Sequence, residues 1–183
     1  MADALSGPHS APEGRRRVVY AIVCGAPPAT DIHVFVKLAQ AAGWDVCVIP
    51  TPEGRRWLDA DALAELTGHP VRSTFVLPGE EGDSLPPADA ILVAPATLNT
   101  VNKFRYGIAD TFAVGVLCEA RGLGIPIVIA SNVKDVLASH PAFEESLQEL
   151  RRWGVLVLEQ AAIPRGVRLP SWDALVEELN QIA

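Results

Sequence analysis

Small and polar residues follow two of the apolar runs of this 183-residue chain, where a parallel sheet would present them to a ligand. The first run ends in Cys24-Gly25-Ala26-Pro27, a tight sequence whose backbone N–H groups could receive a phosphate at a helix N-terminus. The second ends in Pro50-Thr51-Pro52, where the Thr51 hydroxyl could donate to the same phosphate. Because the other glycines of a GxGxxG fingerprint are missing, a plain strand–helix turn is the alternative interpretation.

The segment after the third apolar run is the richest in hydrogen-bonding side chains. It reads Pro95-Ala96-Thr97-Leu98-Asn99-Thr100 and continues through Lys103 to Gly107-Ile108-Ala109-Asp110. Its amide and hydroxyl groups can bond the polar edge of an aromatic ring system, and the small Ala96 lets the backbone approach closely. The structural alternative is a helix entry capped by Thr97 or Asn99.

Five apolar runs, rich in Val and Ile and without alternation, predict strands that are buried on both faces. They span residues 18–24, 45–49, 90–94, 126–130 and 154–158. Helices are predicted at residues 30–42, 60–66, about 100–121, 142–153 and 172–182. This alternation predicts an α/β fold, a single-domain Rossmann-like (flavodoxin-like) three-layer sandwich with a parallel sheet. Ligands of such sheets bind beyond the carboxyl ends of the strands, where the polar segments fall.

Composition narrows the classes of partner. Hydrophobic residues make up 49% and charged residues 20% of the chain, which excludes a disordered polypeptide. The net charge of −7 argues against a nucleic-acid partner, and no apolar run reaches the roughly 18 residues of a membrane span. Cys24, Cys47 and Cys118 form neither a disulfide framework nor a metal site, so we expect ordinary buried cysteines, no metal and a cytoplasmic protein.

The first residues are polar and rich in turn formers. We expect residues 1–16 to form a flexible N-terminal tail ahead of one folded, ligand-binding domain over residues 17–183. Arg15-Arg16-Arg17 before an apolar run also looks like the beginning of a signal peptide. A first strand is the favoured interpretation, because similar apolar runs recur along the chain.

The segment 95–110 resembles the PASANT signature and its K…GIAD continuation in the homo-oligomeric flavin-containing cysteine decarboxylases. That family includes phosphopantothenoylcysteine decarboxylase and the peptidyl-cysteine decarboxylases. The matching residues are Pro95, Ala96, Asn99, Thr100, Lys103, Gly107, Ile108, Ala109 and Asp110. The likeness continues in order through Gly25-Ala26, Thr51-Pro52, residues 67–71 and residues 140–142, and covers roughly residues 17–158.

The resemblance implies FMN, bound between the protomers of a homotrimer or of a dodecamer built from trimers. The loop from Pro95 to Thr100 would hold the flavin ring, and the segments Gly25-Ala26-Pro27 and Thr51-Pro52 would lie at its phosphate. Asn132 matches the family's asparagine that meets the substrate carboxylate. Both methionines and the tryptophan of that motif are absent here, and Lys134 adds a cation that could hold an acidic group.

Glu81 falls near the position of the family's catalytic histidine. Its carboxylate could act as a base beside an apolar flavin, with a solvated acidic loop as the alternative. Residues 159–183 lack the cysteine that helps pantothenate-pathway members to reduce the enethiol intermediate. We therefore expect FMN-dependent oxidative decarboxylation of a cysteine-type substrate, such as a peptide ending in cysteine, to an enethiol. The alternative is an FMN-binding partner or regulatory subunit without decarboxylase activity.

Overall fold

A computed structural model describes residues 15–75, 84–158 and 169–182. In this part of the chain, parallel strands form one five-stranded sheet in the order β2-β1-β3-β4-β5. The strands are β1 (Arg17–Val23), β2 (Trp44–Pro50), β3 (Ala90–Ala96), β4 (Ile127–Ser131) and β5 (Leu156–Leu158). The five predicted strands are confirmed, including the first, which pairs with both β2 and β3.

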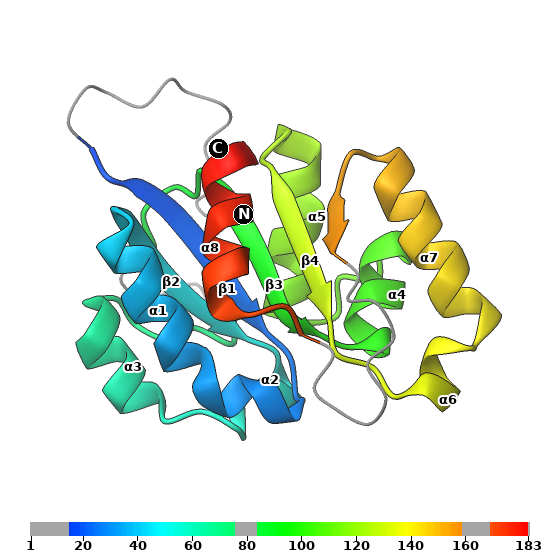
Figure 1. Ribbon diagram of the computed structural model, residues 1–183, viewed down its shortest axis with the longest axis horizontal. Helices are drawn as coiled ribbons and strands as arrows, with labels where there is room; N and C mark the ends of the chain where they lie inside the picture. The colour runs from blue at the N-terminus through cyan, green and yellow to red at the C-terminus, as the bar shows by residue number, and fades with distance from the viewer. Residues whose placement is uncertain (1–14, 76–83, 159–168, 183) are drawn as a thin grey trace.

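Helices cover both faces of the sheet, so the fold has three layers (Figure 1). One face carries α1 (Ile32–Ala41), α3 (Ala60–Thr67) and α8 (Trp172–Ile182), and the other carries α4 (Leu98–Tyr106), α5 (Phe112–Leu123) and α7 (Pro141–Arg152). Successive side chains of β1 alternate between two hydrophobic clusters: Val19 and Ala21 face α1 and α8, whereas Tyr20 and Ile22 face α5. With this strand order, the predicted flavodoxin-like α/β sandwich is confirmed.

The prediction of one helix over residues 100–121 is wrong, because the structure has α4 and α5 there. Gly107 ends α4 with a φ of 67°, a left-handed conformation that glycine reaches without steric cost. Thr111 begins α5 by accepting a hydrogen bond from the Val114 N–H at 3.3 Å. An ion pair of 2.6 Å between Lys103 Nζ and Asp110 Oδ2 closes the turn between the two helices.

Short helical turns follow three of the strands directly. They are η1 (Pro27–Asp31) after β1, α2 (Pro52–Arg55) after β2 and α6 (Asp135–Ala138) after β4. The sequence predictions include neither α2 nor α6, because four residues are too few to show a helical period. These turns form the carboxyl edge of the sheet, which is the edge predicted to bind a ligand.

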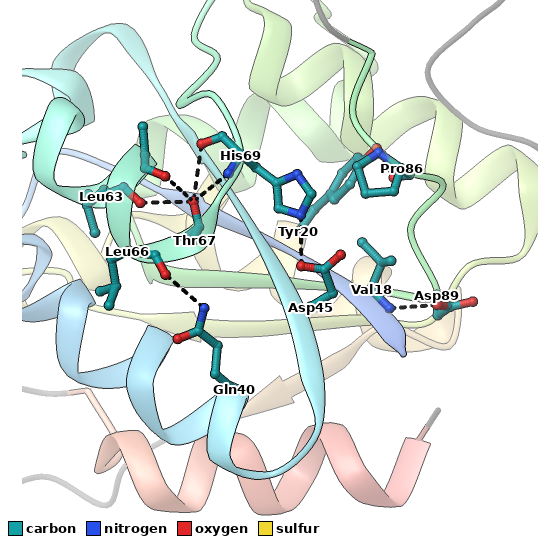
Figure 2. A network of polar contacts seen from close by, with 11 residues as sticks. Val18, Tyr20, Gln40, Asp45, Leu63, Leu66, Thr67, His69, Pro86 and Asp89 are labelled. Carbon is teal, nitrogen blue, oxygen red and sulfur yellow. Dashed lines mark hydrogen bonds and ion pairs between the residues drawn. The ribbon is translucent and has the colours of Figure 1, made fainter. Parts of the chain in front are cut away.

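Polar contacts fasten the opposite, amino edge of the sheet (Figure 2). Asp89 lies just before β3 and accepts a hydrogen bond from the Val18 N–H at 2.6 Å. The same carboxylate receives the Arg15 guanidinium at 2.7 Å and 2.9 Å. His69 Nε2 lies 2.8 Å from Asp45 Oδ1, which holds the segment after α3 to the beginning of β2.

Among the described residues, no helix is both long and apolar enough to cross a membrane. That part of the chain also brings together no group of three or more His, Cys, Asp or Glu side chains able to hold a metal ion. Residues 1–14 of the predicted N-terminal tail lie outside the described residues.

Candidate functional site

Backbone hydrogen bonds join the carboxyl ends of β1, β3 and β4. The Cys24 N–H donates to the Pro95 carbonyl at 3.1 Å, and the Asn132 N–H donates to the Ala96 carbonyl at 2.8 Å. The residues predicted after these three strands therefore meet at one place, around the end of β3. Asn132 in particular is attached to the predicted flavin loop through its backbone.

The predicted flavin loop joins β3 to α4. Pro95 and Ala96 are buried at the end of β3, and Thr97 is the extended residue that precedes α4. Asn99 is exposed in the first turn of α4, whereas Thr100 is buried beneath it. The loop thus presents an amide to solvent and rests on a small, closely packed base, as a planar ring requires.

Cys24 connects this loop to β1 a second time, through its side chain. Its Sγ donates to Thr100 Oγ1 at 3.2 Å, and Thr97 Oγ1 lies 3.4 Å from the same oxygen. Burial raises the pKa of the Cys24 thiol, which therefore stays protonated and able to donate. The predicted burial of Cys24 is confirmed, whereas its bond to Thr100 was not predicted; the one available signal was the place of Cys24 directly after β1.

Asn132 presents a side chain that is free to bind a ligand. The residue is half-buried, and its amide has no hydrogen-bond partner among the described residues. The Lys134 ammonium two positions later is exposed and likewise has no partner within the described ranges. Both can approach an acidic group, the first as a neutral donor and the second as a cation.

The α2 turn packs tightly on the residues after β1. Thr51 is buried and begins α2 by accepting the Gly54 N–H on Oγ1 at 3.0 Å. A Cβ on Gly54 would lie 2.0 Å from the Val23 carbonyl oxygen, and one on Gly25 would lie 3.0 Å from the Glu53 Cβ. The absence of a side chain at Gly25 and Gly54 therefore permits this close approach.

The residues predicted to bind a phosphate lie next to one another, but they differ in whether they have a free N–H or O–H group to donate. Pro27 has no N–H, and the Ala26 N–H donates to the Cys24 carbonyl at 2.9 Å. The Gly25 N–H has no partner in the described part of the chain. The Thr51 hydroxyl oxygen accepts the Gly54 N–H as the cap of α2, and its own O–H makes a long contact of 3.5 Å to the carbonyl of Val23.

The donor set at the end of β3 fits the polar edge of a flavin ring. Asn99 supplies an amide that can donate and accept, and Ala96 leaves room for a ring to lie close to the backbone. Glu81, the predicted base, lies outside the described residues, so its role stays a prediction.

Comparison with known proteins identifies the family. The model of the family described as Flavoprotein matches residues 8–183. The coenzyme A biosynthesis bifunctional protein CoaBC of Mycolicibacterium smegmatis is 30% identical over 151 residues, which cover 81% of this chain and 36% of that protein. CoaBC of Thermococcus kodakarensis is 30% identical over 159 residues, covering 81% and 38%. The chain thus spans little more than a third of these relatives.

Solved structures share the fold at lower identity. The FMN-dependent cysteine decarboxylase SpaF has a TM-score of 0.73 at 24% identity, with 92% of this chain and 97% of that chain covered. A PPC decarboxylase mutant complexed with pantothenoylaminoethenethiol has a TM-score of 0.75 at 15% identity, with 91% and 98% covered. Since the family match runs from residue 8 to the last residue, this chain belongs to the Flavoprotein family.

Proposed function

We propose that this protein catalyses the FMN-dependent oxidative decarboxylation of a cysteine-type substrate, such as a peptide ending in cysteine, to an enethiol. One observation carries the proposal: Asn132, bonded through its N–H to Ala96 of the flavin loop at 2.8 Å, has a side-chain amide without a partner in the described residues. The decarboxylases among the fold neighbours and the CoaBC relatives support this reaction class.

The chain's own residues would bind and orient the reactants. When bound, the flavin supplies an acceptor for a hydride from the β-carbon of the cysteine, after which CO2 can leave and an enethiol remains. Asn132 would hold the departing carboxylate with its NH2 group, without adding a charge that would stabilise the substrate more than the transition state. The loop from Pro95 to Thr100 would seat the flavin ring. The Gly25-Ala26-Pro27 and Thr51 segments would lie at the end of the flavin away from its ring. Glu81 would act as the base that takes a proton from the substrate.

Asn132→Ala tests the proposal. We expect the variant to keep its yellow colour but to release CO2 from a cysteine-terminated peptide at least about 100-fold more slowly, a typical loss for one electrostatic contact at a reacting group. Asn132→Asp, which places a like charge against the carboxylate at nearly the same size, should lose activity too. The measurements are flavin absorbance per chain and CO2 release in a single anaerobic turnover. Unchanged release by both variants would contradict the proposal.

The second candidate, a flavin-binding partner or regulatory subunit, is favoured by the residues around Asn132. Ser131, Asp135 and Val136 stand where the family has its two methionines and its tryptophan, so the substrate motif is altered around Asn132, and Val136 is 78% exposed on α6. Wild-type protein that binds flavin but releases no CO2 from any cysteine-terminated peptide would favour this role. We propose in either case a homotrimer, or a dodecamer of trimers, with α6 in the contact between protomers.

A further inference from the structure

The turn after β1 has few N–H groups with which to hold a phosphate. Pro27 and Pro28 occupy the first two positions of η1 and carry no N–H, and the Ala29 N–H donates to the Ala26 carbonyl at 2.9 Å. The Ala26 N–H is bonded in turn to the carbonyl of Cys24 at 2.9 Å. Anions bind at helix starts through unpaired N–H groups of this first turn. The first turn of η1 offers none of them.

The turn after β2 offers the Thr51 hydroxyl, which makes a long contact of 3.5 Å to the Val23 carbonyl, but few free N–H groups. Pro52 stands at the first position of α2, the Thr51 N–H bonds back to β1 at 2.9 Å, and the Gly54 N–H caps onto Thr51. In the described residues of the two turns, the N–H groups of Gly25 and Glu53 are the ones left without a partner. The second of these belongs to a residue whose own side chain is an anion.

A cavity of about 340 Å³ opens beside η1, and its lining is unsuited to an anion. Its lining residues are Pro27, Pro28, Asp31, Leu169, Pro170, Ser171 and Trp172. Asp31 brings a carboxylate and Ser171 a hydroxyl, whereas neither lysine nor arginine occurs among these residues. A carboxylate repels a phosphate dianion but accepts hydrogen bonds from the hydroxyl groups of a ribityl chain.

We infer that this site holds a flavin by its ring and ribityl chain without relying on the 5′-phosphate, so that riboflavin binds about as tightly as FMN. The inference rests on the proposed flavin site and concerns what that site recognises. The cations at the end of α2 are not fixed toward this turn: Arg56, which follows the helix, pairs with Glu53 at 3.1 Å, and Arg55 is exposed to solvent, where a charge is screened.

Titration of the flavin-free full chain with riboflavin and with FMN, followed by flavin fluorescence at two salt concentrations, tests the inference. We expect the two dissociation constants to agree within about tenfold and their ratio to be insensitive to salt. FMN binding more than about tenfold tighter would overturn the inference and leave the proposed function standing. Binding of neither flavin would overturn the proposed flavin site itself.

Variants separate the groups involved. Asp31→Asn should raise the affinity for FMN several-fold relative to riboflavin, because a repulsive charge is removed, whereas Asp61→Asn, in the exposed first turn of α3, should not. Pro27→Ala restores an N–H and should act in the same direction, with Pro141→Ala at the same position of α7 as its control. A loss of FMN affinity alone in Arg55→Ala, by about tenfold or more, would show a phosphate contact and overturn the inference.

Discussion

At the scale of single residues, the site depends on a thiol that takes no part in the proposed chemistry. Cys24 bonds to the flavin loop twice, through its N–H to the Pro95 carbonyl and through its thiol to Thr100 Oγ1. Since the side chain is buried, its removal would leave the Thr100 hydroxyl without this donor and the base of the loop less fixed. Such a residue positions the loop rather than the substrate.

Cys24→Val should therefore weaken flavin binding by about three- to tenfold, the equivalent of one net hydrogen bond. Cys24→Ser should restore most of the affinity, because a hydroxyl can donate to Thr100 as the thiol does. Cys47→Val is a matched control: Cys47 is equally buried in the same cluster, one strand away from the loop. Fluorescence titration gives the affinities, and equal losses in the two valine variants would reduce the role of Cys24 to packing.

At the scale of elements, α8 is fixed to the amino edge of the sheet and also reaches the cavity beside η1. The Trp44 indole N–H donates to Asn180 Oδ1 at 2.9 Å, and the Arg17 guanidinium lies 4.3 Å from the centre of the Trp44 ring. At its other end, Trp172 lies 6.0 Å from Phe35 of α1, ring centre to ring centre, and lines the cavity. The docking of α8 therefore determines the shape of that cavity.

Asn180→Ala should lower the free energy of unfolding by about 1 kcal/mol, because the buried indole N–H of Trp44 loses its acceptor. Gln181→Ala, a neighbouring exposed position of α8, should change it by less than about 0.5 kcal/mol. Urea unfolding followed by tryptophan fluorescence measures both. Equal stability of the two variants would contradict this account of how α8 is held.

At the scale of the whole molecule, the amino and carboxyl ends of the strands differ in how their polar groups are used. The amino edge is fastened by side-chain contacts such as Asp89 to Val18 and His69 to Asp45 (Figure 2), whereas the turns at the carboxyl edge leave Asn99 and Asn132 free to bind. The exposed apolar side chains of α6 follow this carboxyl edge directly. An assembly through α6 would therefore place protomer contacts next to the proposed flavin.

Val136→Asp tests that assembly. We expect the variant to form a smaller assembly than the wild type and to lose flavin, since a charge buried in an interface is strongly unfavourable. Val34→Asp, at an exposed apolar position of α1, serves as the control and should leave the assembly intact. Light scattering after gel filtration gives the masses. A wild-type monomer would contradict the proposed trimer whatever the variants do.

Much of this fold could be predicted because buried parallel strands are continuous apolar runs, and five such runs mark the sheet. The site could be predicted in part: the turn residues follow the strands in sequence, so Asn132 and the segment 95–100 were identifiable. The bond between Cys24 and Thr100 was not, because it joins residues 76 positions apart and depends on how β1 and β3 align. The break between α4 and α5 was predictable in principle, because glycine is common just after the end of a helix and Gly107 stands there. The helical pattern on either side of Gly107 obscures this signal.

The position of each strand in the sheet also determines how often the part of the site attached to it opens. β1 and β3 lie in the interior of the sheet, each paired on both sides, whereas β5 is three residues long and, among the described residues, pairs with β4 alone (Figure 1). Local opening begins at such sparsely paired margins and costs far less than global unfolding. The margin at β5 can therefore open locally while the loop from Pro95 to Thr100, attached to the interior strands, keeps its shape. Fluctuations of this rim alone would then leave the seat of the proposed flavin ring in place.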